Sequence, residues 1–210
     1  MKYNQESNTS CVYGDIPQNI LEVISKKGVV ACDIETSGLD WKECEIGTFQ
    51  VLCPGSSPLI VIVNHSVPSN LCLMLEDVAI NKVFHHAIFD LRFIIEKWQI
   101  RPSCISCTKI ASKLLDPSGQ SNHSLKPLLQ KYLGVTINKD EQRSDWLSPN
   151  LSVDQIRYAV TDVMYLIDLL GVLEGELRSK GLLELAHACF KHIPTRAKLD
   201  LLGYTDLYTY

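Results

Sequence analysis

This 210-residue sequence lacks several features that would assign it to a protein class. No apolar run approaches the roughly 20 residues of a membrane-spanning helix, so we expect no membrane association. The first 15 residues are polar and lack the apolar core of a secretory signal, which favours a cytoplasmic protein. Repeats and low-complexity tracts are also missing, which argues against a solenoid or a disordered chain.

A strong positive charge, common in nucleic-acid-binding proteins, is missing too, since the net charge is −4. The eight cysteines do not indicate disulfides, because several lie in apolar segments, where a free thiol packs as a small hydrophobe. The only CxxC pair is Cys104 and Cys107, and a structural zinc site would need a second pair of ligands. We therefore expect reduced thiols.

The patterns that are present predict one α/β domain over residues 15–210, after a flexible N-terminus at 1–14. Asp15 can cap a short helix that ends at Gly28. Strands are then predicted at 28–35, 46–53, 58–64 and 82–86, the second and third forming a hairpin.

The rest of the chain reads as mainly helical. One long helix begins after Ser152 with a capping-box pattern, and the last helical stretch ends near Pro194. This order of elements predicts a mixed β-sheet flanked by helices.

Acidic side chains at the end of the first predicted strand suggest chemistry. Asp33 and Glu35 lie two residues apart, so their side chains point to the same face of the strand. Two such carboxylates repel each other unless a cation lies between them, and oxygen ligands select hard ions such as Mg²⁺ or Mn²⁺. From this pair alone, however, a solvent-facing strand end is the simpler interpretation.

Two helices carry further candidates. Asp90 lies in the first turn of a predicted helix, where the helix dipole alone would favour an acid. In the helix at 155–170, Tyr158 and Asp162 lie at the margin of the apolar stripe. Side chains that line a cleft occupy such a margin, although plain helices often carry similar pairs.

In this order, the motifs "DIETSGLD", "HHAIFDLRF" and "YAVTD" resemble the DEDD superfamily of 3′→5′ exonucleases, in its tyrosine-bearing branch. That branch contains ribonuclease D and the proofreading domain of bacterial family A DNA polymerases. The stretch from His123 to Trp146 is similar to the corresponding linker of ribonuclease D. The resemblance implies a ribonuclease H-like exonuclease domain.

The resemblance also implies residue roles in a reaction that uses two divalent ions, Mg²⁺ or Mn²⁺. Asp33, Glu35 and Asp162 would hold the ion that activates water, and Asp33 and Asp90 the ion near the leaving oxygen. Tyr158 would orient the attacking water, because its ordinary pKa near 10 suits an orienter better than a general base.

The same matching places substrate contacts at further positions. Leu39 would wedge against the terminal base, with packing of the turn as the alternative, and the backbone near Thr36 would meet the terminal sugar. His86 stands where relatives often have an asparagine that grips the strand, so its charge could vary near neutral pH. Lys139 and Arg143 could contact phosphates.

We therefore expect an enzyme that hydrolyses single-stranded nucleic acid from its 3′ end and releases nucleoside 5′-monophosphates, with RNA favoured over DNA. No obligatory protein partner is implied. Exonuclease activity on single-stranded DNA is the nearest alternative. A third alternative is an inactive nucleic-acid-binding module, which would usually have lost one or more metal ligands.

Overall fold

The computed structural model describes residues 9–63, 66–137 and 144–207. The strands are β1 (Ser10–Tyr13), β2 (Val29–Thr36), β3 (Ile46–Leu52), β4 (Leu59–Ile62), β5 (Asn81–Phe84) and β6 (Ile105–Cys107). The helices are α1 (Gln18–Lys27), α2 (Ser69–Glu76), α3 (Ala87–Trp98), α4 (Thr108–Leu114), α5 (Leu125–Leu133), α6 (Val153–Met164), α7 (Leu166–Ser179) and α8 (Leu183–Leu201).

The strands form one mixed sheet in the order β1-β4-β3-β2-β5-β6. β2, β3 and β4 pair antiparallel, and β5 and β6 extend the sheet parallel to β2. The predicted α/β class, the mixed sheet and the hairpin of β3 and β4 are therefore confirmed. β2 lies inside the sheet: its first residues, Val29 to Ala31, pair with β5, and its carboxyl half pairs with β3 alone.

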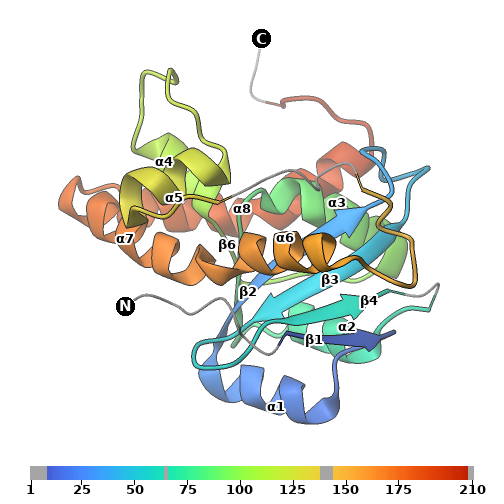
Figure 1. Cartoon of the computed structure of the whole chain (residues 1–210). Helices are drawn as coiled ribbons and strands as arrows, with labels where there is room; N and C mark the ends of the chain where they lie inside the picture. The colour runs from blue at the N-terminus through green and yellow to red at the C-terminus, as the bar shows by residue number, and fades with distance from the viewer. Residues whose placement is uncertain (1–8, 64–65, 138–143, 208–210) are drawn as a thin grey trace.

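The helices cover the sheet, and those from the C-terminal part of the chain pack against its central strands. In Figure 1, α6 runs in front of the strands and α7 lies to its left, and α6 packs on β2, β3 and β4. α8 packs along α3 and against the edge strand β6. The residues of β2 and those of α6 are therefore neighbours in space although they are far apart in sequence.

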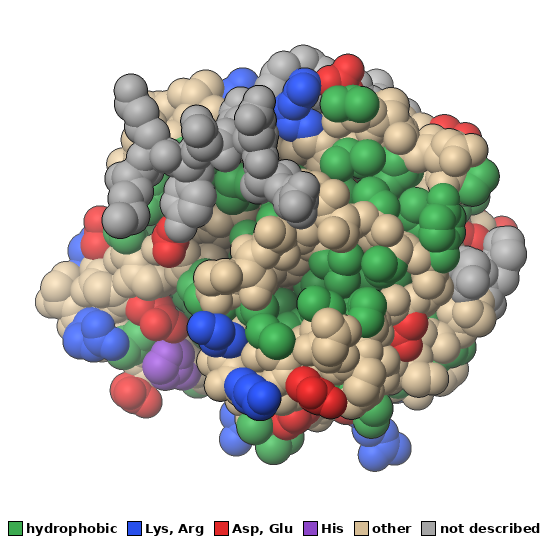
Figure 2. All heavy atoms as spheres, turned by 60° about the horizontal axis from the view of Figure 1, so that its bottom comes forward, with side chains coloured by type: hydrophobic (Ala, Val, Ile, Leu, Met, Phe, Trp, Pro, Cys, Tyr) green, Lys and Arg blue, Asp and Glu red, His purple; other side chains and the backbone are tan. Residues whose placement is uncertain are grey.

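Figure 2 shows the face that lies at the bottom of Figure 1, where α1 is found. Hydrophobic side chains gather near the middle of this face, and Lys, Arg, Asp and Glu are scattered around them. The described basic side chains form no continuous surface in this view, so this face offers no track for a phosphate backbone.

Two predicted helix ends are confirmed. Gly28 ends α1 with a positive φ of 69°, which glycine adopts without strain. At the start of α6, Ser152 Oγ accepts from Gln155 N–H at 3.1 Å, and Gln155 Oε1 accepts from Ser152 N–H at 2.9 Å. This reciprocal pair is the predicted capping box, and it sets the residue at which α6 begins.

Asp15 was predicted to cap α1, and this prediction is wrong. The first turn of α1 has no side-chain cap. Asp15 instead accepts the backbone N–H groups of Asn70 and Leu71, at 2.6 and 3.0 Å, in the first turn of α2. The carboxylate thus satisfies free donors and faces the positive end of a helix dipole, but in a helix distant in sequence.

The N-terminus also differs from the prediction. Ser10–Tyr13 lie within the segment expected to be flexible, yet they form β1 and pair with β4. This strand is largely exposed, so its sequence carries little hydrophobic signal. The short strand β6 was also not predicted from the sequence.

The C-terminal helices differ as well. Tyr165, with φ −116°, separates α6 from α7, so the predicted long helix is two helices that cover different elements. α8 continues past Pro194, because Phe190, Ile193 and Ala197 are buried on both sides of it. Burial of large side chains contributes about 1.5–3 kcal/mol each, which offsets the roughly 3 kcal/mol that an internal proline costs.

Two expectations about the whole chain can be compared with the structure. Among the described residues, the helices are too short or too polar to cross a membrane. All eight cysteines are free thiols, as predicted, and Cys107 is buried in β6 whereas Cys104 is exposed.

Candidate active site

The end of β2 supplies the first two carboxylates. Asp33 and Glu35 face Gln50 and Thr48 of β3, and the β2–β3 register shifts directly after Glu35. A bulge of this kind bends a strand and changes the direction of the side chains that follow it. Both acids therefore lie just before the point where β2 leaves the regular ladder.

α6 supplies the third carboxylate and the tyrosine. Asp162 and Tyr158 are 8% and 7% exposed, so they are more buried than their predicted place at the margin of the apolar stripe. For Tyr158, the difference arises because the indole of Trp146 packs on its ring, and helical periodicity does not predict this contact.

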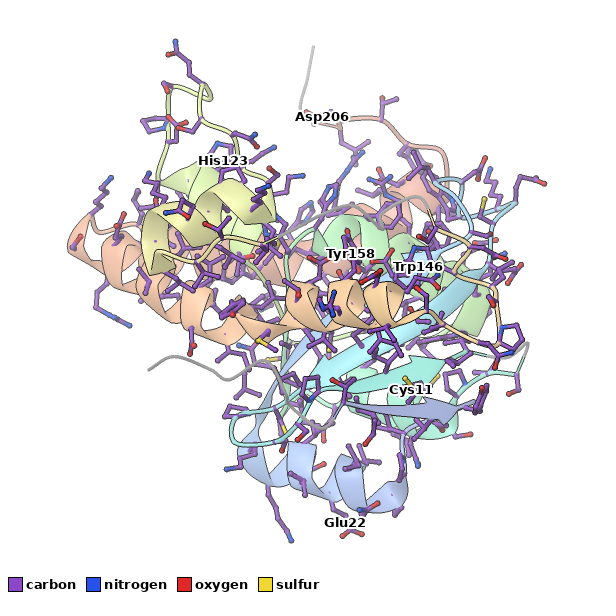
Figure 3. The ribbon with its side chains drawn as sticks, viewed as in Figure 1. Cys11, Glu22, His123, Trp146, Tyr158 and Asp206 are labelled. Atoms are coloured by element: carbon purple, nitrogen blue, oxygen red, sulfur yellow. The ribbon has the colours of Figure 1, made fainter. Side chains whose placement is uncertain are left out.

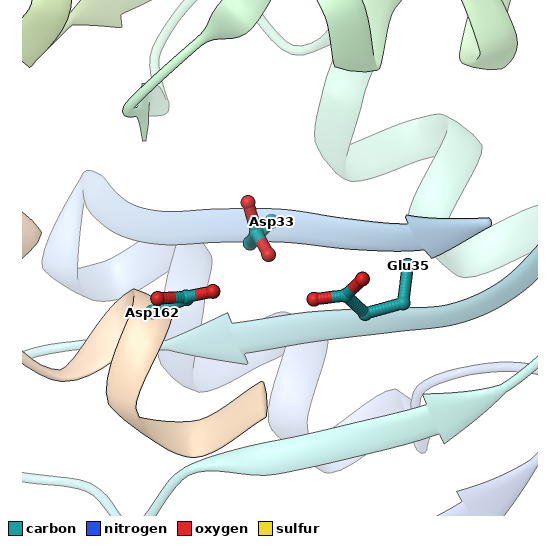
Figure 4. Close-up of side chains that lie close together, drawn as sticks. All are labelled: Asp33, Glu35 and Asp162. Carbon is teal, nitrogen blue, oxygen red and sulfur yellow. The ribbon is translucent and has the colours of Figure 1, made fainter. Parts of the chain in front are cut away.

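The carboxylates of Asp33, Glu35 and Asp162 converge, as Figure 4 shows. Each offers one oxygen atom, and these three oxygen atoms lie within 4.8 Å of one another. Three negative charges at this spacing repel one another by a few kcal/mol per pair at an effective dielectric constant near 20. Carboxylate oxygens in this arrangement suit a hard divalent cation, which would remove the repulsion.

Asp90 lies in the first turn of α3 and is bonded to the strand that carries two of these carboxylates. Its side chain is 2% exposed, and its Oδ1 accepts the backbone N–H of Ile34, the residue between Asp33 and Glu35, at 3.3 Å. Burial raises the pKa of Asp90 well above its usual range, and the charge of Asp162 raises it further. A nearby cation would reverse this shift, because it favours the ionised form.

Tyr158 is held as a neutral phenol. Burial raises its pKa far above the usual value, and the charges of Asp162, Glu35 and Asp33 raise it further. Its hydroxyl also forms a side-chain hydrogen bond with Asp162, one helical turn away. The protonated hydroxyl can donate a hydrogen bond, which suits a group that orients a neighbour.

The turn after β2 holds two predicted substrate contacts. Thr36 Oγ1 donates to the carbonyl of Gly38 at 2.6 Å, which fixes the start of the turn. Leu39 follows with 80% of its surface exposed. Packing inside the turn, the alternative considered for Leu39, is therefore wrong, and its apolar side chain is open to contact with a ligand.

His86 directly precedes α3 and is exposed. Partial desolvation lowers its pKa to about 4, and the nearby cations Lys109, Arg92 and Lys113 lower it further. The imidazole is therefore neutral near pH 7, which differs from the variable charge expected from the sequence. Lys109 and Lys113 of α4 were not among the predicted contacts. Lys139 and Arg143 lie outside the described residues.

Two structural residues near the site carried little signal in the sequence. The backbone of β3 at Gly47 touches Trp146, and the Trp146 ring packs on Tyr158. Trp146 was expected to pack rather than to stack on a base, and its 1% exposure confirms this. Nothing in the sequence pointed to Gly47, because a close approach between distant segments has no local pattern.

Comparison with known proteins places this site in a family. Residues 14–178 match the model of a 3′-5′ exonuclease family, which covers more than three quarters of the chain, and the chain belongs to this family. Two of the motifs that carry the resemblance supply the carboxylates that converge, Asp33 and Glu35 from one and Asp162 from another.

Solved structures of one relative extend this finding. The chain is 33% identical to the solved structure of Brucella melitensis NrnC, with a TM-score of 0.89 over 96% of this chain and 98% of that one. Structures similar to this chain include the same protein with bound Mg²⁺ and bound to pGG.

The chain is also 30% identical to ribonuclease D of Musicola paradisiaca over 164 residues, which are 78% of this chain and 43% of that protein. It therefore spans less than half the length of this curated relative. A third relative, DNA polymerase I of Aquifex aeolicus, is 39% identical over 87 residues, which are 41% of this chain and 14% of the polymerase.

Proposed function

We propose that this protein removes nucleotides from the 3′ end of single-stranded nucleic acid, with RNA favoured, and releases nucleoside 5′-monophosphates. The observation that carries the proposal is the convergence of Asp33, Glu35 and Asp162 beside the hydroxyl of Tyr158. Hydrolysis of a phosphodiester needs an oriented nucleophile and stabilisation of negative charge, and such a cluster can provide both once it binds cations.

Asp33, Glu35 and Asp162 would hold one divalent ion, and Asp33 and Asp90 a second, with Mg²⁺ or Mn²⁺ as the ions. The donor set fits, because it consists of carboxylate oxygens in a partly buried site where their mutual repulsion calls for a cation. When bound, such ions supply a nucleophile at neutral pH and stabilise charge on the phosphate. Tyr158 contributes a neutral hydroxyl that orients the attacking water.

The turn after β2 and the first turn of α3 would hold the 3′ end. Leu39 is exposed enough to wedge against the terminal base, and the backbone near Thr36 would meet the terminal sugar. The neutral ring of His86 would donate a hydrogen bond to the strand. Lys139 and Arg143 remain proposed phosphate contacts.

Very short RNA belongs to the proposed substrates. The Brucella melitensis relative, which this chain matches along almost its full length, has been solved bound to pGG. The turn with Leu39 and the carboxylate cluster lie at the end of one strand, so a dinucleotide could reach both.

Single-stranded DNA is the second candidate substrate. It is favoured by the identity with DNA polymerase I of Aquifex aeolicus, which at 39% exceeds that with ribonuclease D, although over a shorter stretch. Preference for RNA would require a contact to the 2′-hydroxyl, which DNA lacks.

Digestion of matched 5′-labelled RNA and DNA strands, and of pGG, with Mg²⁺, Mn²⁺ or EDTA tests the proposal. We expect stepwise shortening of RNA and cleavage of pGG with either metal, and no cleavage in EDTA. Faster loss of DNA would reverse the substrate preference. Binding of RNA without cleavage in any metal would instead indicate an inactive nucleic-acid-binding module.

A further inference from the structure

The segment at 144–152, which leads into α6, is fastened to the sheet and to α6. Tyr13 of β1 donates its hydroxyl hydrogen to the carbonyl of Pro149 at 2.8 Å. Gln155 of α6 donates from Nε2 to the carbonyl of Asp145 at 2.9 Å. Because Gln155 also closes the capping box with Ser152, the segment and the first turn of α6 form one hydrogen-bonded unit.

At Gly47 of β3, this segment comes into direct contact with the backbone of the sheet. A Cβ atom at position 47 would lie 2.1 Å from the carbonyl oxygen of Trp146 and 3.0 Å from its Cβ atom. Both atoms are fixed parts of the chain and not the ends of flexible side chains. Only glycine therefore permits this approach, and the approach fixes the height of Trp146 above β3.

Trp146 in turn supports the ring of Tyr158. The two ring centroids are 5.9 Å apart at an interplanar angle of 46°, and Figure 3 shows the two side chains next to each other. With Ile60, Ala159 and Val160 they form a small apolar cluster separate from the main core. The indole is 1% exposed, so it cannot reach a base, and its Nε1 has no hydrogen-bond partner among the described residues.

We propose that Trp146, seated on Gly47, is a positioning residue that holds the Tyr158 hydroxyl at the carboxylate cluster. The polar end of Tyr158 is bonded to Asp162, whereas Trp146 supports its apolar ring. Loss of the indole would let the ring tilt and move its hydroxyl away from the attacking water. This inference rests on the proposed function, because it assigns a purpose to a contact of the catalytic tyrosine.

The test is a double-mutant cycle of Trp146→Leu and Tyr158→Phe, measured as kcat and KM on labelled RNA with Mg²⁺. We expect Tyr158→Phe to lower kcat about 100-fold, within the range for an aligned proton-handling group. Trp146→Leu should lower kcat about 10-fold with little change in KM, since misplacement of a reacting group costs rate more than binding. In the Tyr158→Phe background, Trp146→Leu should have no further effect.

Losses that multiply in the double variant would overturn the proposal, because they would mean that Trp146 acts independently of the Tyr158 hydroxyl. Trp98→Phe is the control, since Trp98 is also buried and packs on Phe49 of the main core at 5.8 Å. An equal loss of kcat in this control would reduce Trp146 to a stability role.

Two further variants keep the test decisive if Trp146→Leu does not fold. Trp146→Phe removes an unpaired N–H and keeps an aromatic ring, and it should restore most of kcat. Gly47→Ala should reproduce the kcat defect without altering either ring. Normal kcat in folded Gly47→Ala would refute the claim that the close approach at Gly47 positions Trp146. A wild-type protein inactive in every metal would instead contradict the proposed function itself.

Discussion

Neutralising Asp162 should make the metal-free protein more stable and should remove the stabilisation that a bound divalent cation provides. Asp162→Asn deletes one of three charges whose oxygen atoms lie within 4.8 Å. At this distance a pair of like charges repels by about 3.5 kcal/mol at a dielectric constant of 20 and by about 0.9 kcal/mol in water. Asp33 is only half-buried, so we expect a net gain of roughly 1–3 kcal/mol in the free energy of unfolding.

The substitution keeps the local structure, because the side-chain oxygen of asparagine can still accept from the Tyr158 hydroxyl. It removes a proposed metal ligand, however. A cation at about 100 times its Kd stabilises the wild type by roughly 2.7 kcal/mol. For a chain of this size this corresponds to a rise in Tm of about 5–10 °C. Asp162→Asn should show little of this rise.

Calorimetry in EDTA and in saturating Mg²⁺ measures both effects. Asp168→Asn is the matched control, because it removes the same charge from an exposed position in the first turn of α7 and should keep the full Mg²⁺ response. The reasoning is refuted if Asp162→Asn is less stable than the wild type in EDTA. An unchanged Mg²⁺ shift in this variant would mean that Asp162 is not a ligand.

Three further substitutions test separate parts of the site. Asp33→Ala should abolish cleavage on labelled RNA, because one carboxylate serves both proposed ions, and near-normal activity would mean that the site is elsewhere. Leu39→Ala should leave Tm within about 1 °C, because the side chain is 80% exposed, but should raise KM several-fold; unchanged KM would exclude a wedge. His86→Asn should leave the pH–rate profile near neutral pH unchanged, because the pKa of His86 is lowered to about 4. A folded pKa below the unfolded value of about 6.5 also means that wild-type stability falls as pH drops through this window, and the variant should lose that part of the fall.

The basic side chains around His86 bear on how a protein of net charge −4 could bind nucleic acid. Lys109 and Lys113 on α4 and Arg92 on α3 lie close enough to His86 to lower its pKa. Arg92 is also paired with Asp200 at 2.8 Å. Lys109 and Lys113 thus place positive charge near His86, the proposed contact to the substrate strand, whereas the face in Figure 2 mixes both signs.

Local patterns predicted the parts of the site that depend on neighbouring residues. Alternation along β2 places Asp33 and Glu35 on one face, and helical spacing places Tyr158 beside Asp162. The capping box at Ser152 set the start of α6. These predictions succeeded because hydrogen bonding within a strand or helix fixes the direction of each side chain.

Other predictions failed because distant segments compete for the same groups. Asp15 has the sequence context of a cap for α1, but the free N–H groups of α2 lie within its reach. Pro194 has the context of a helix end, but burial along α8 outweighs its cost. Exposure of Leu39 and the lowered pKa of His86 likewise depend on what surrounds each side chain in space.

The sequence by itself determined the mixed α/β class and the family resemblance, and it supplied the four carboxylates and the tyrosine that we propose for the site. The meeting of Asp162 with Asp33 and Glu35 was implied by the resemblance alone, and the tertiary structure gives its geometry. Only the tertiary structure decided that Trp146 packs directly on the backbone of Gly47 and supports Tyr158. The physical reason is the range of the interactions. Strand alternation and helix phase are written in consecutive residues, whereas a metal cluster and a close backbone approach exist only after the chain has brought β2, β3 and α6 together.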